Sequence, residues 1–174
     1  MPNAAIFLDR DGVINDNTRH VNHPRDLVLY PWVSSAIRQL KEAGYYVFIV
    51  TNQGGIELGF LTHRQLEAIH SQLRLLLAAE NAEIDEIVYC PHFHHPCNCR
   101  KPKPGMLQTL IDKYHLDPAL CWMIGDRETD SMAGKAAGCR TIKLGDPDPY
   151  AEITCTHLGE AAERILCLKA ETPL

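Results

Sequence analysis

The sequence predicts an α/β protein with a doubly wound, mainly parallel sheet that carries helices on both faces. Three observations predict this class: short apolar runs recur along the chain, helical patterns alternate with them, and acidic or glycine-rich turns follow several of the runs. A chain of 174 residues can bury one sizeable apolar core but not two. We therefore expect a single domain over residues 1–174.

Each predicted strand is a short apolar run bounded by turn-forming or charged residues. The runs lack the polar–apolar alternation of a half-exposed strand, so we expect strands that are buried on both faces. In chain order, the predicted strands are Ala4–Leu8, Tyr46–Val50, Ile87–Tyr89, Trp122–Ile124 and Thr141–Leu144.

Helical periodicity fills the intervals between these runs, because apolar residues recur there three or four positions apart. A capping box from Thr62 to Gln65 predicts where the second helix begins. The short segment Asp146–Pro149 is predicted to be a turn and not a domain linker. The expected helices carry Val33, Ile37 and Leu40 (ending at Gly44), Leu66, Ile69, Leu73 and Leu76, then Leu107, Leu110, Ile111 and Tyr114, then Asp130 to Ala137, and finally Ala161, Ile165 and Leu168.

The net charge of -5 offers no basic field that would attract nucleic acid or an acidic membrane surface. The first apolar run ends at Asp9 and no cationic segment precedes it, so we expect neither a secretory signal nor a membrane span. These features predict a cytoplasmic protein that works as a monomer on a small substrate, without nucleic acid or membrane as a partner.

Two aspartates, Asp9 and Asp11, follow the first predicted strand directly. Residues i and i+2 leaving a strand point to one side of the crevice beyond the strand ends, where parallel sheets bind ligands. Two like charges that are buried together are costly unless a cation neutralises them. The pair therefore implies a divalent ion, most simply Mg²⁺. The alternative is a solvated turn, since most Asp-x-Asp-Gly sequences are turns.

Two further strand ends bring polar groups to the same edge of the sheet. The second strand leads into Thr51 and a Gly54–Gly55 turn, where a hydroxyl and approachable backbone amides suit a phosphate. A Gly-Gly turn without a ligand is the common alternative. The fourth strand leads into Asp126, a candidate for the third metal carboxylate. Asp130 either caps the next helix or supports the site from behind.

The longest irregular segment, Pro91–Gly105, supplies cations through Arg100 and Lys101, and its prolines stiffen the chain that holds them. Together with the strand ends, these residues suffice for phosphoryl transfer. A carboxylate can attack phosphorus to form an acyl phosphate that water then hydrolyses. Magnesium and Lys101 would neutralise the transferring group, and Thr51 would donate a hydrogen bond to it.

The chain has seven cysteines, an odd number, and three of them crowd together beside several histidines. Metal binding therefore explains them better than disulfides do. A set of three cysteines and one histidine is typical of structural zinc sites, which leave no position open for water. His94 and His95 are rival ligands, for which we expect solvent exposure. The predicted ligands are Cys90, His92, Cys97 and Cys99, in a zinc loop at about 90–99 that would fix Arg100 and Lys101, while Cys121, Cys139, Cys155 and Cys167 are interpreted as small core residues.

At this point the chain resembles the haloacid dehalogenase superfamily of aspartate-nucleophile phosphatases. The resemblance implies a Rossmann-like fold, and no segment between the first two motifs could form a large cap domain. The segment Cys97–Met106 is similar, more narrowly, to D-glycero-D-manno-heptose 1,7-bisphosphate phosphatases, and histidinol-phosphate phosphatases share much of this signature. The superfamily motifs occur in order as Asp9-Arg10-Asp11-Gly12-Val13, Thr51, Lys101 and Gly125-Asp126-x-x-x-Asp130.

The resemblance implies a role for each matching residue. Asp9 would be the nucleophile, and Asp11 would protonate the leaving alcohol and then activate water. Magnesium would be held by Asp9, the main-chain carbonyl of Asp11 and Asp126. The remaining implied roles are phosphoryl contacts from Thr51 and Lys101, and contacts to the rest of the substrate from Arg100, Asn52 and Gln53.

Three segments depart from the pattern of the heptose enzymes. The loop Asn17–His20 lacks their Asp-x-Gly-Tyr pattern, Leu58 stands where an arginine is frequent, and the stretch between His92 and Cys97 is short. These departures concern the substrate and leave the reaction unchanged.

The resulting prediction is a magnesium-dependent phosphatase that also binds zinc and removes the 7-phosphate of the heptose bisphosphate. One alternative is a histidinol-phosphate phosphatase or another phosphatase of small molecules. A polynucleotide phosphatase is disfavoured by the negative charge and the lack of basic and aromatic tracts. The alternative from another class is a zinc-stabilised binding module without catalysis, which would have lost residues such as Asp9 or Lys101; both are present.

Overall fold

The structure is a computed structural model that describes residues 3–171. Its elements alternate along the chain, as the sequence predicts. The strands are β1 (Ala5–Leu8), β2 (Tyr46–Asn52), β3 (Glu86–Cys90), β4 (Trp122–Gly125), β5 (Arg140–Leu144) and β6 (Ile153–Cys155). The α-helices are α1 (Val33–Glu42), α2 (His63–Ala79), α3 (Gly105–Tyr114), α4 (Glu128–Ala136) and α5 (Leu158–Glu171), and short 3-10 helices occur at Pro24–Asp26 and Pro118–Leu120.

The strands form one six-stranded sheet in the order β3-β2-β1-β4-β5-β6, and every neighbouring pair is parallel. Leu8 at the end of β1 is level with Ile49 of β2 and Ile124 of β4. The chain winds outward from β1 in both directions, so the carboxyl ends of β1, β2 and β4 meet at the switch point where such sheets bind ligands.

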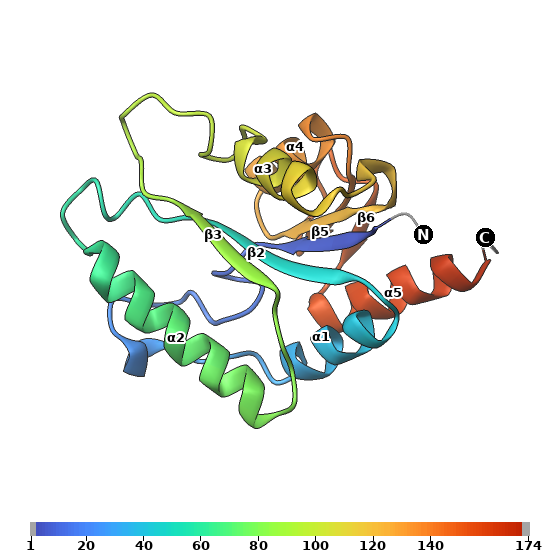
Figure 1. Ribbon diagram of the computed structural model, residues 1–174, viewed down its shortest axis with the longest axis horizontal. Coiled ribbons are helices and arrows are strands. Elements are labelled where there is room, and N and C mark those ends of the chain that lie inside the picture. The colour runs from blue at the N-terminus through green and yellow to red at the C-terminus, as the bar shows by residue number, and fades with distance from the viewer. Residues whose placement is uncertain (1–2, 172–174) are drawn as a thin grey trace.

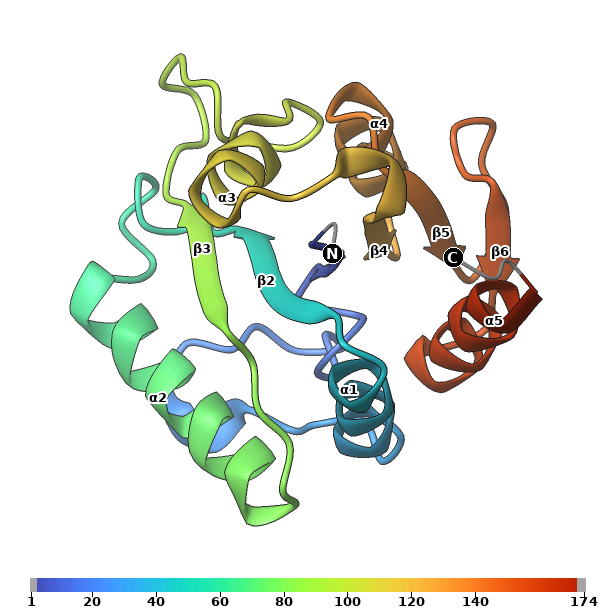
Figure 2. The ribbon, with the colours of Figure 1, turned by 45° about the vertical axis from the view of Figure 1, so that its right-hand side comes forward.

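Helices cover both faces of the sheet (Figures 1 and 2). Helices α1, α2 and α5 lie on one face, and α3 and α4 lie on the other. Side chains that alternate along a strand serve the two cores: Ile6 and Leu8 belong to the first core, and Ala5 and Phe7 to the second. The predicted α/β class with a doubly wound, parallel sheet is confirmed.

Local signals explain most of the element boundaries. Thr62 and Gln65 form the predicted capping box, in which the Thr62 hydroxyl accepts the Gln65 N–H and the Gln65 side chain accepts the Thr62 N–H. Between β1 and β2 the described chain forms only a 3-10 helix and α1, so no cap domain is inserted there. No helix in residues 3–171 is long and apolar enough to cross a bilayer.

The elements differ from the prediction in three respects. Strand β6 was not predicted, because it has only three residues and one of them is exposed. Strand β3 is half-buried along most of its length, since it lies at an edge of the sheet. Cys167 is exposed on α5, whereas Cys121, Cys139 and Cys155 are buried as expected.

The segment between β5 and β6 is a turn, as predicted, in which the Asp148 carboxylate accepts the N–H groups of Tyr150 and Ala151.

Candidate active site

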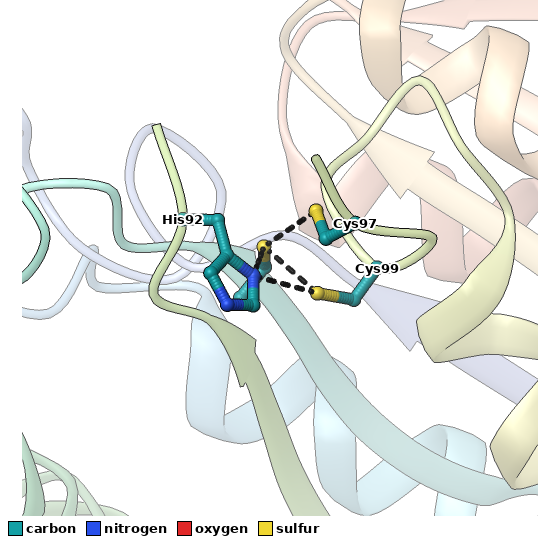
Figure 3. A group of neighbouring side chains, drawn as sticks. His92, Cys97 and Cys99 are labelled. Atoms are coloured by element: carbon teal, nitrogen blue, oxygen red, sulfur yellow. Dashed lines mark hydrogen bonds between the residues drawn. The ribbon is translucent and has the colours of Figure 1, made fainter. Parts of the chain in front are cut away.

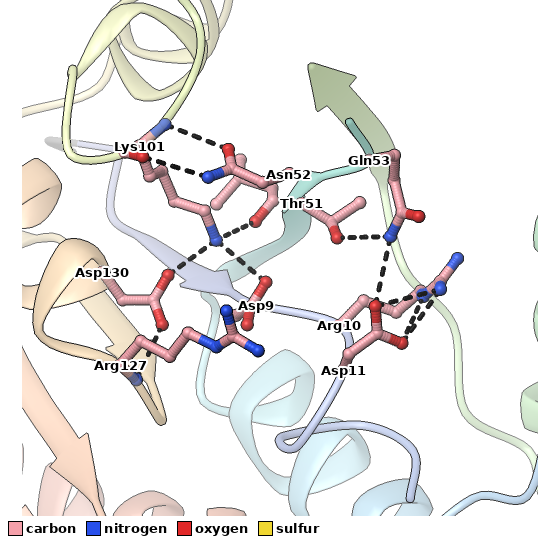
Figure 4. Close-up of polar contacts among 10 residues, drawn as sticks. Asp9, Arg10, Asp11, Thr51, Asn52, Gln53, Lys101, Arg127 and Asp130 are labelled. Carbon is pink, nitrogen blue, oxygen red and sulfur yellow. Dashed lines mark hydrogen bonds and ion pairs between the residues drawn. The ribbon is translucent and has the colours of Figure 1, made fainter. Parts of the chain in front are cut away.

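The centre of the site is a buried lysine between two carboxylates (Figure 4). The Lys101 Nζ donates to Asp9 Oδ1 at 2.8 Å and to the Val50 carbonyl at 2.8 Å, and it forms an ion pair with Asp130 Oδ1 at 2.7 Å. These groups come from the end of β1, from β2, from the segment before α3 and from α4. The sheet therefore brings together residues that are far apart in the chain, and Lys101 is the shared partner of the Asp9 and Asp130 carboxylates.

Burial raises the pKa of Asp9 to about 7, and the negative charges of Asp130 and Asp126 add to this effect although Lys101 opposes it. Burial alone would lower the pKa of Lys101, but Asp9 and Asp130 outweigh it and raise that pKa. Lys101 is therefore charged at neutral pH, and one ammonium group does not balance the surrounding carboxylates. The site has an excess of negative charge that a cation would relieve.

Asp126 follows β4 and completes a cluster of carboxylates. Oxygens of Asp9, Asp126 and Asp130 lie within 4.8 Å of one another, and Asp126 Oδ1 is buried without a hydrogen-bond partner among the described residues. Burial raises the pKa of Asp126, and the nearby Asp130 raises it further. Buried carboxylate oxygens that lack a donor are the ligands Mg²⁺ prefers, so this cluster fits the ion.

Gly12 makes room for Asp126. Its φ is +84°, and a Cβ at this position would lie 2.2 Å from Asp126 Oδ2. Glycine therefore has two functions here: it adopts the left-handed backbone that the turn after Asp11 requires, and it leaves space for the Asp126 carboxylate.

Asp11 lies in a separate hydrogen-bonded group beside this cluster (Figure 4). The Arg10 guanidinium contacts both of its oxygens at 2.9–3.1 Å, and the amides of Asn15 and Gln53 donate to them at 3.0 and 3.2 Å. Burial alone would raise the pKa of Asp11, but Arg10 and these hydrogen bonds lower it. Arg10 is itself buried, and its Nη1 lies 3.3 Å from His70 Nε2.

The turn after β2 connects the two groups. Gln53 Nε2 donates both to Thr51 Oγ1 at 2.9 Å and to Asp11 at 3.2 Å. The Asn52 amide donates to the Lys101 carbonyl and accepts the Lys101 N–H, both at 3.0 Å. Asn52 therefore fixes the backbone that carries the lysine. The predicted contact between Asn52 and the substrate stays a prediction.

The predicted zinc ligands come together at the end of β3 (Figure 3). Ligand atoms of Cys90, His92, Cys97 and Cys99 all lie within 4.8 Å of one another, and His92 Nδ1 is 3.5 Å from Cys90 Sγ and 3.4 Å from Cys99 Sγ. Three sulfurs and one nitrogen at this spacing fit a tetrahedral zinc ion. His94 and His95 are exposed, as expected.

The sulfur atoms differ in their ease of ionisation. Burial raises the pKa of Cys90 to about 12, and its contact with Cys99 adds to that shift. Burial alone would also raise the pKa of Cys97, but hydrogen bonds from the backbone of Arg100 and Cys99 lower it to about 6. Cys97 therefore supplies a thiolate at neutral pH, which is the form that binds zinc.

Arg100 and Lys101 directly follow Cys99, the last of the predicted zinc ligands. Arg100 Nη1 donates to the His92 carbonyl at 3.0 Å, and its guanidinium carbon lies 4.9 Å from the centre of the Phe93 ring. The peptide bond between Lys101 and Pro102 is cis. The predicted zinc ligands and the buried Lys101 thus belong to one continuous segment, as the sequence predicts.

Sequence reasoning missed part of the site. It left open whether Asp130 caps α4 or supports the site, and the structure shows both: Oδ1 pairs with Lys101, and Oδ2 accepts the Arg127 N–H. Arg10, Asn15 and His70 around Asp11 were not predicted. Arg10 lies between the two motif aspartates, but no local pattern indicates that its side chain turns inward.

Comparisons with known proteins agree with this geometry. The HAD-hydrolase-like family model matches residues 98–145. The chain is 36% identical to D-glycero-beta-D-manno-heptose-1,7-bisphosphate 7-phosphatase of Pseudomonas aeruginosa, over 95% of this chain and 99% of that protein. It is 37% identical to the protein of the same name from Escherichia coli K12, over 97% and 91% of the two chains.

Solved structures of heptose bisphosphate phosphatases also match the fold of this chain. The fold matches D,D-heptose 1,7-bisphosphate phosphatase from B. bronchiseptica, crystallised with magnesium and phosphate, with a TM-score of 0.87 and 31% identity over 95% of this chain and 99% of that one. It also matches the enzyme of that description from Burkholderia thailandensis, with a TM-score of 0.71 and 27% identity over 94% and 98% of the chains.

Proposed function

Because the chain belongs to the haloacid dehalogenase-like hydrolases, in the family of the D-glycero-beta-D-manno-heptose-1,7-bisphosphate 7-phosphatases, we propose that it removes the 7-phosphate of D-glycero-D-manno-heptose 1,7-bisphosphate. One observation carries the proposal: Asp9 lies between a buried lysine and a carboxylate with an unpartnered oxygen, at the carboxyl edge of a parallel sheet. This arrangement suits a nucleophile that must accept a negatively charged phosphoryl group.

In the first step the Asp9 carboxylate attacks phosphorus, and the bond from phosphorus to the sugar oxygen breaks. Asp11 gives a proton to the departing sugar oxygen, which leaves as an alcohol. Lys101 is held within hydrogen-bond distance of Asp9 and neutralises charge on the transferring group, while the Thr51 hydroxyl donates to it. When bound, magnesium would be held by Asp9, the Asp11 carbonyl and Asp126, and would neutralise the phosphoryl oxygens.

In the second step Asp11 takes a proton from water, and the water oxygen attacks phosphorus and displaces the Asp9 carboxylate. The hydrogen bonds from Arg10, Asn15 and Gln53 hold Asp11 in position, and the lowered pKa of Asp11 keeps it in its basic form when the water must be activated. The two carboxylates thus have separate tasks: Asp9 bonds to phosphorus, and Asp11 moves protons to and from the reacting oxygens.

The experiment is a phosphate-release panel that compares both anomers of heptose 1,7-bisphosphate with histidinol phosphate and simple sugar phosphates. We expect the highest kcat/KM for the bisphosphate, and no release by Asp9→Asn with any substrate. A clear preference for histidinol phosphate would assign the chain to that related activity. If Asp9→Asn and the wild-type protein were equally inactive on every phosphate, the non-catalytic binding module would be the better interpretation.

We also propose that residues 1–174 act as one phosphatase domain in which the zinc loop at about 90–99 fixes Arg100 and Lys101. The clustered thiols would have to stay reduced to bind zinc, which favours the cytoplasm as the compartment. A monomer without nucleic-acid or membrane partners agrees with the net charge of -5. Light scattering coupled to size-exclusion chromatography tests the monomer directly.

A further inference from the structure

A glutamate on the loop between β2 and α2 binds the tip of the zinc loop. The Glu57 carboxylate accepts three consecutive backbone N–H groups, those of Phe93, His94 at 3.1 Å and His95 at 3.0 Å. The Glu57 N–H donates in turn to the Pro91 carbonyl at 3.2 Å. Successive N–H groups that converge on one carboxylate form an anion-binding concavity. The hydrogen bond from the Phe93 N–H, followed by those from His95 and His94, lowers the pKa of Glu57. The side chain is therefore ionised at neutral pH.

The segment that Glu57 binds also positions Arg100. The His92 carbonyl accepts a hydrogen bond from Arg100 Nη1 at 3.0 Å, and the Phe93 ring lies 4.9 Å from the guanidinium carbon. Gly54 lies against both side chains, because a Cβ there would be 2.9 Å from Phe93 Cδ2 and 3.0 Å from Arg100 Nη1. A continuous set of contacts therefore runs from Glu57 through residues 92–93 to the guanidinium group.

Zinc ligands and Glu57 hold opposite parts of the same loop. The ligands His92 and Cys97 fix its two ends. Residues 93–96 between them are exposed, and the N–H groups of residues 93–95 bind Glu57. Figure 1 shows the β2–α2 loop and the loop after β3 at the same end of the sheet. An arginine that is already held in place loses less side-chain entropy when it binds a phosphate, and its planar fork matches the oxygens of that group.

We propose that Glu57 is a positioning residue for substrate selectivity: by fixing the tip of the zinc loop it holds Arg100 where it binds the second phosphate of the substrate, away from Asp9. The inference rests on the proposed function, because it requires a substrate with two phosphates. Glu57 would have no part in the chemical step, since its contacts lie on the zinc loop and not in the group around Asp9 and Lys101.

The test measures steady-state kinetics of the zinc- and magnesium-loaded enzyme on heptose 1,7-bisphosphate and on a simple sugar monophosphate. In Glu57→Gln and Glu57→Ala we expect KM for the bisphosphate to rise about tenfold, which corresponds to one weakened charged contact, with kcat little changed. For the monophosphate we expect kcat/KM to stay at the wild-type value. Glu80→Gln, an exposed glutamate at the other end of α2, is the matched control and should change neither substrate.

A double-mutant cycle with Arg100→Ala separates positioning from general loop support. If Glu57 acts through Arg100, adding Glu57→Gln to Arg100→Ala should not raise KM further. Equal losses on both substrates, or a lower zinc content in the Glu57 variants, would overturn the inference and leave the proposed function standing. A wild-type enzyme that does not hydrolyse the bisphosphate would overturn the proposed function and with it the role of Glu57.

Discussion

At the scale of single residues, the charge balance of the site depends on Lys101. Its side chain is 2% exposed and contacts Asp9, Asp130 and the Val50 carbonyl at 2.7–2.8 Å. A buried ammonium group is stable only when such partners surround it, and in the proposed mechanism the same partners fix where its charge meets the transferring phosphoryl group. Asp130 holds Lys101 in place, and we propose that it contributes to catalysis indirectly in this way.

We predict that Asp130→Asn lowers kcat/KM by about a hundredfold, because the lysine loses an anionic partner and moves from its position. The asparagine keeps an oxygen that can accept the Arg127 N–H, so α4 should still form. Thermal unfolding followed by circular dichroism checks the fold of the variant. Full activity together with a lowered Tm would show that Asp130 serves the helix alone.

The pH dependence of stability tests the electrostatics around Asp9. Its pKa rises from 3.8 in the unfolded chain to about 7 in the folded protein without metal. The folded state therefore binds the Asp9 proton more tightly, and the stability that this proton contributes is present below pH 3.8 and lost as the pH rises through about 7.

We predict that the free energy of unfolding of the metal-free wild type falls, relative to that of Asp9→Asn, as the pH rises from about 4 to about 7. Shifts at residues whose pKa does not depend on Asp9, such as the lowered pKa of Asp11, are common to both proteins and cancel in the difference. Urea unfolding in the presence of a chelator measures the difference. Parallel curves for the two proteins across this range would show that Asp9 is not strongly desolvated.

At the scale of elements, the turn that follows β1 combines backbone shape with metal binding. Gly12 and Gly44 both have positive φ, +84° and +89°, but only a Cβ at Gly12 meets a carboxylate. Alanine substitutions at the two glycines therefore distinguish the cost of backbone strain, which both share, from the displacement of Asp126, which only Gly12 causes.

We predict that Gly12→Ala and Gly44→Ala each lose about 1–2 kcal/mol of stability through left-handed backbone strain. Only Gly12→Ala should in addition need far more magnesium for half-maximal activity, because its Cβ displaces Asp126. Magnesium titration of both variants provides the comparison. An unchanged magnesium requirement in Gly12→Ala would contradict the placement of the ion beside Asp126.

The zinc loop is the second element whose role can be tested. We predict that Cys97→Ser loses zinc and has a raised KM while it keeps its fold. The reason is that Arg100 and Lys101 directly follow the proposed ligand Cys99 and depend on it for their position. Cys167→Ser, an exposed cysteine on α5, is the control and should keep both zinc and activity. Metal analysis with kinetics measures both quantities. Unchanged zinc content in Cys97→Ser would remove Cys97 from the ligand set.

The sequence predicted these elements well where the signal is local. Buried parallel strands appear as apolar runs, and the Thr62 cap marks the beginning of α2. Strand β6 could not be found in this way, because its stability comes from pairing with β5 and not from an apolar run. The motif residues Asp9, Thr51, Lys101 and Asp126 were identifiable because each stands at the end of a strand or beside the zinc ligands.

At the scale of the whole molecule, the contacts that could not be predicted from the sequence are the long-range ones. The Lys101–Asp9 pair joins residues 92 positions apart, and the Glu57 contacts join two loops, so no periodicity or spacing encodes them. The sheet produces both, because parallel strands direct their carboxyl ends to one edge. The fold thus gathers the proposed nucleophile Asp9, Lys101 and the carboxylates of Asp126 and Asp130 without a cap domain in the described chain.

The central claim is that Asp9 becomes covalently phosphorylated during turnover. Quenching the working enzyme with borohydride would reduce an aspartyl phosphate to homoserine, and peptide mass spectrometry would locate the product. We predict homoserine at position 9 in the wild type only when substrate and magnesium are present, and none in Asp9→Asn. Unmodified Asp9 in an enzyme quenched during rapid turnover, or the modification at another carboxylate, would contradict the account.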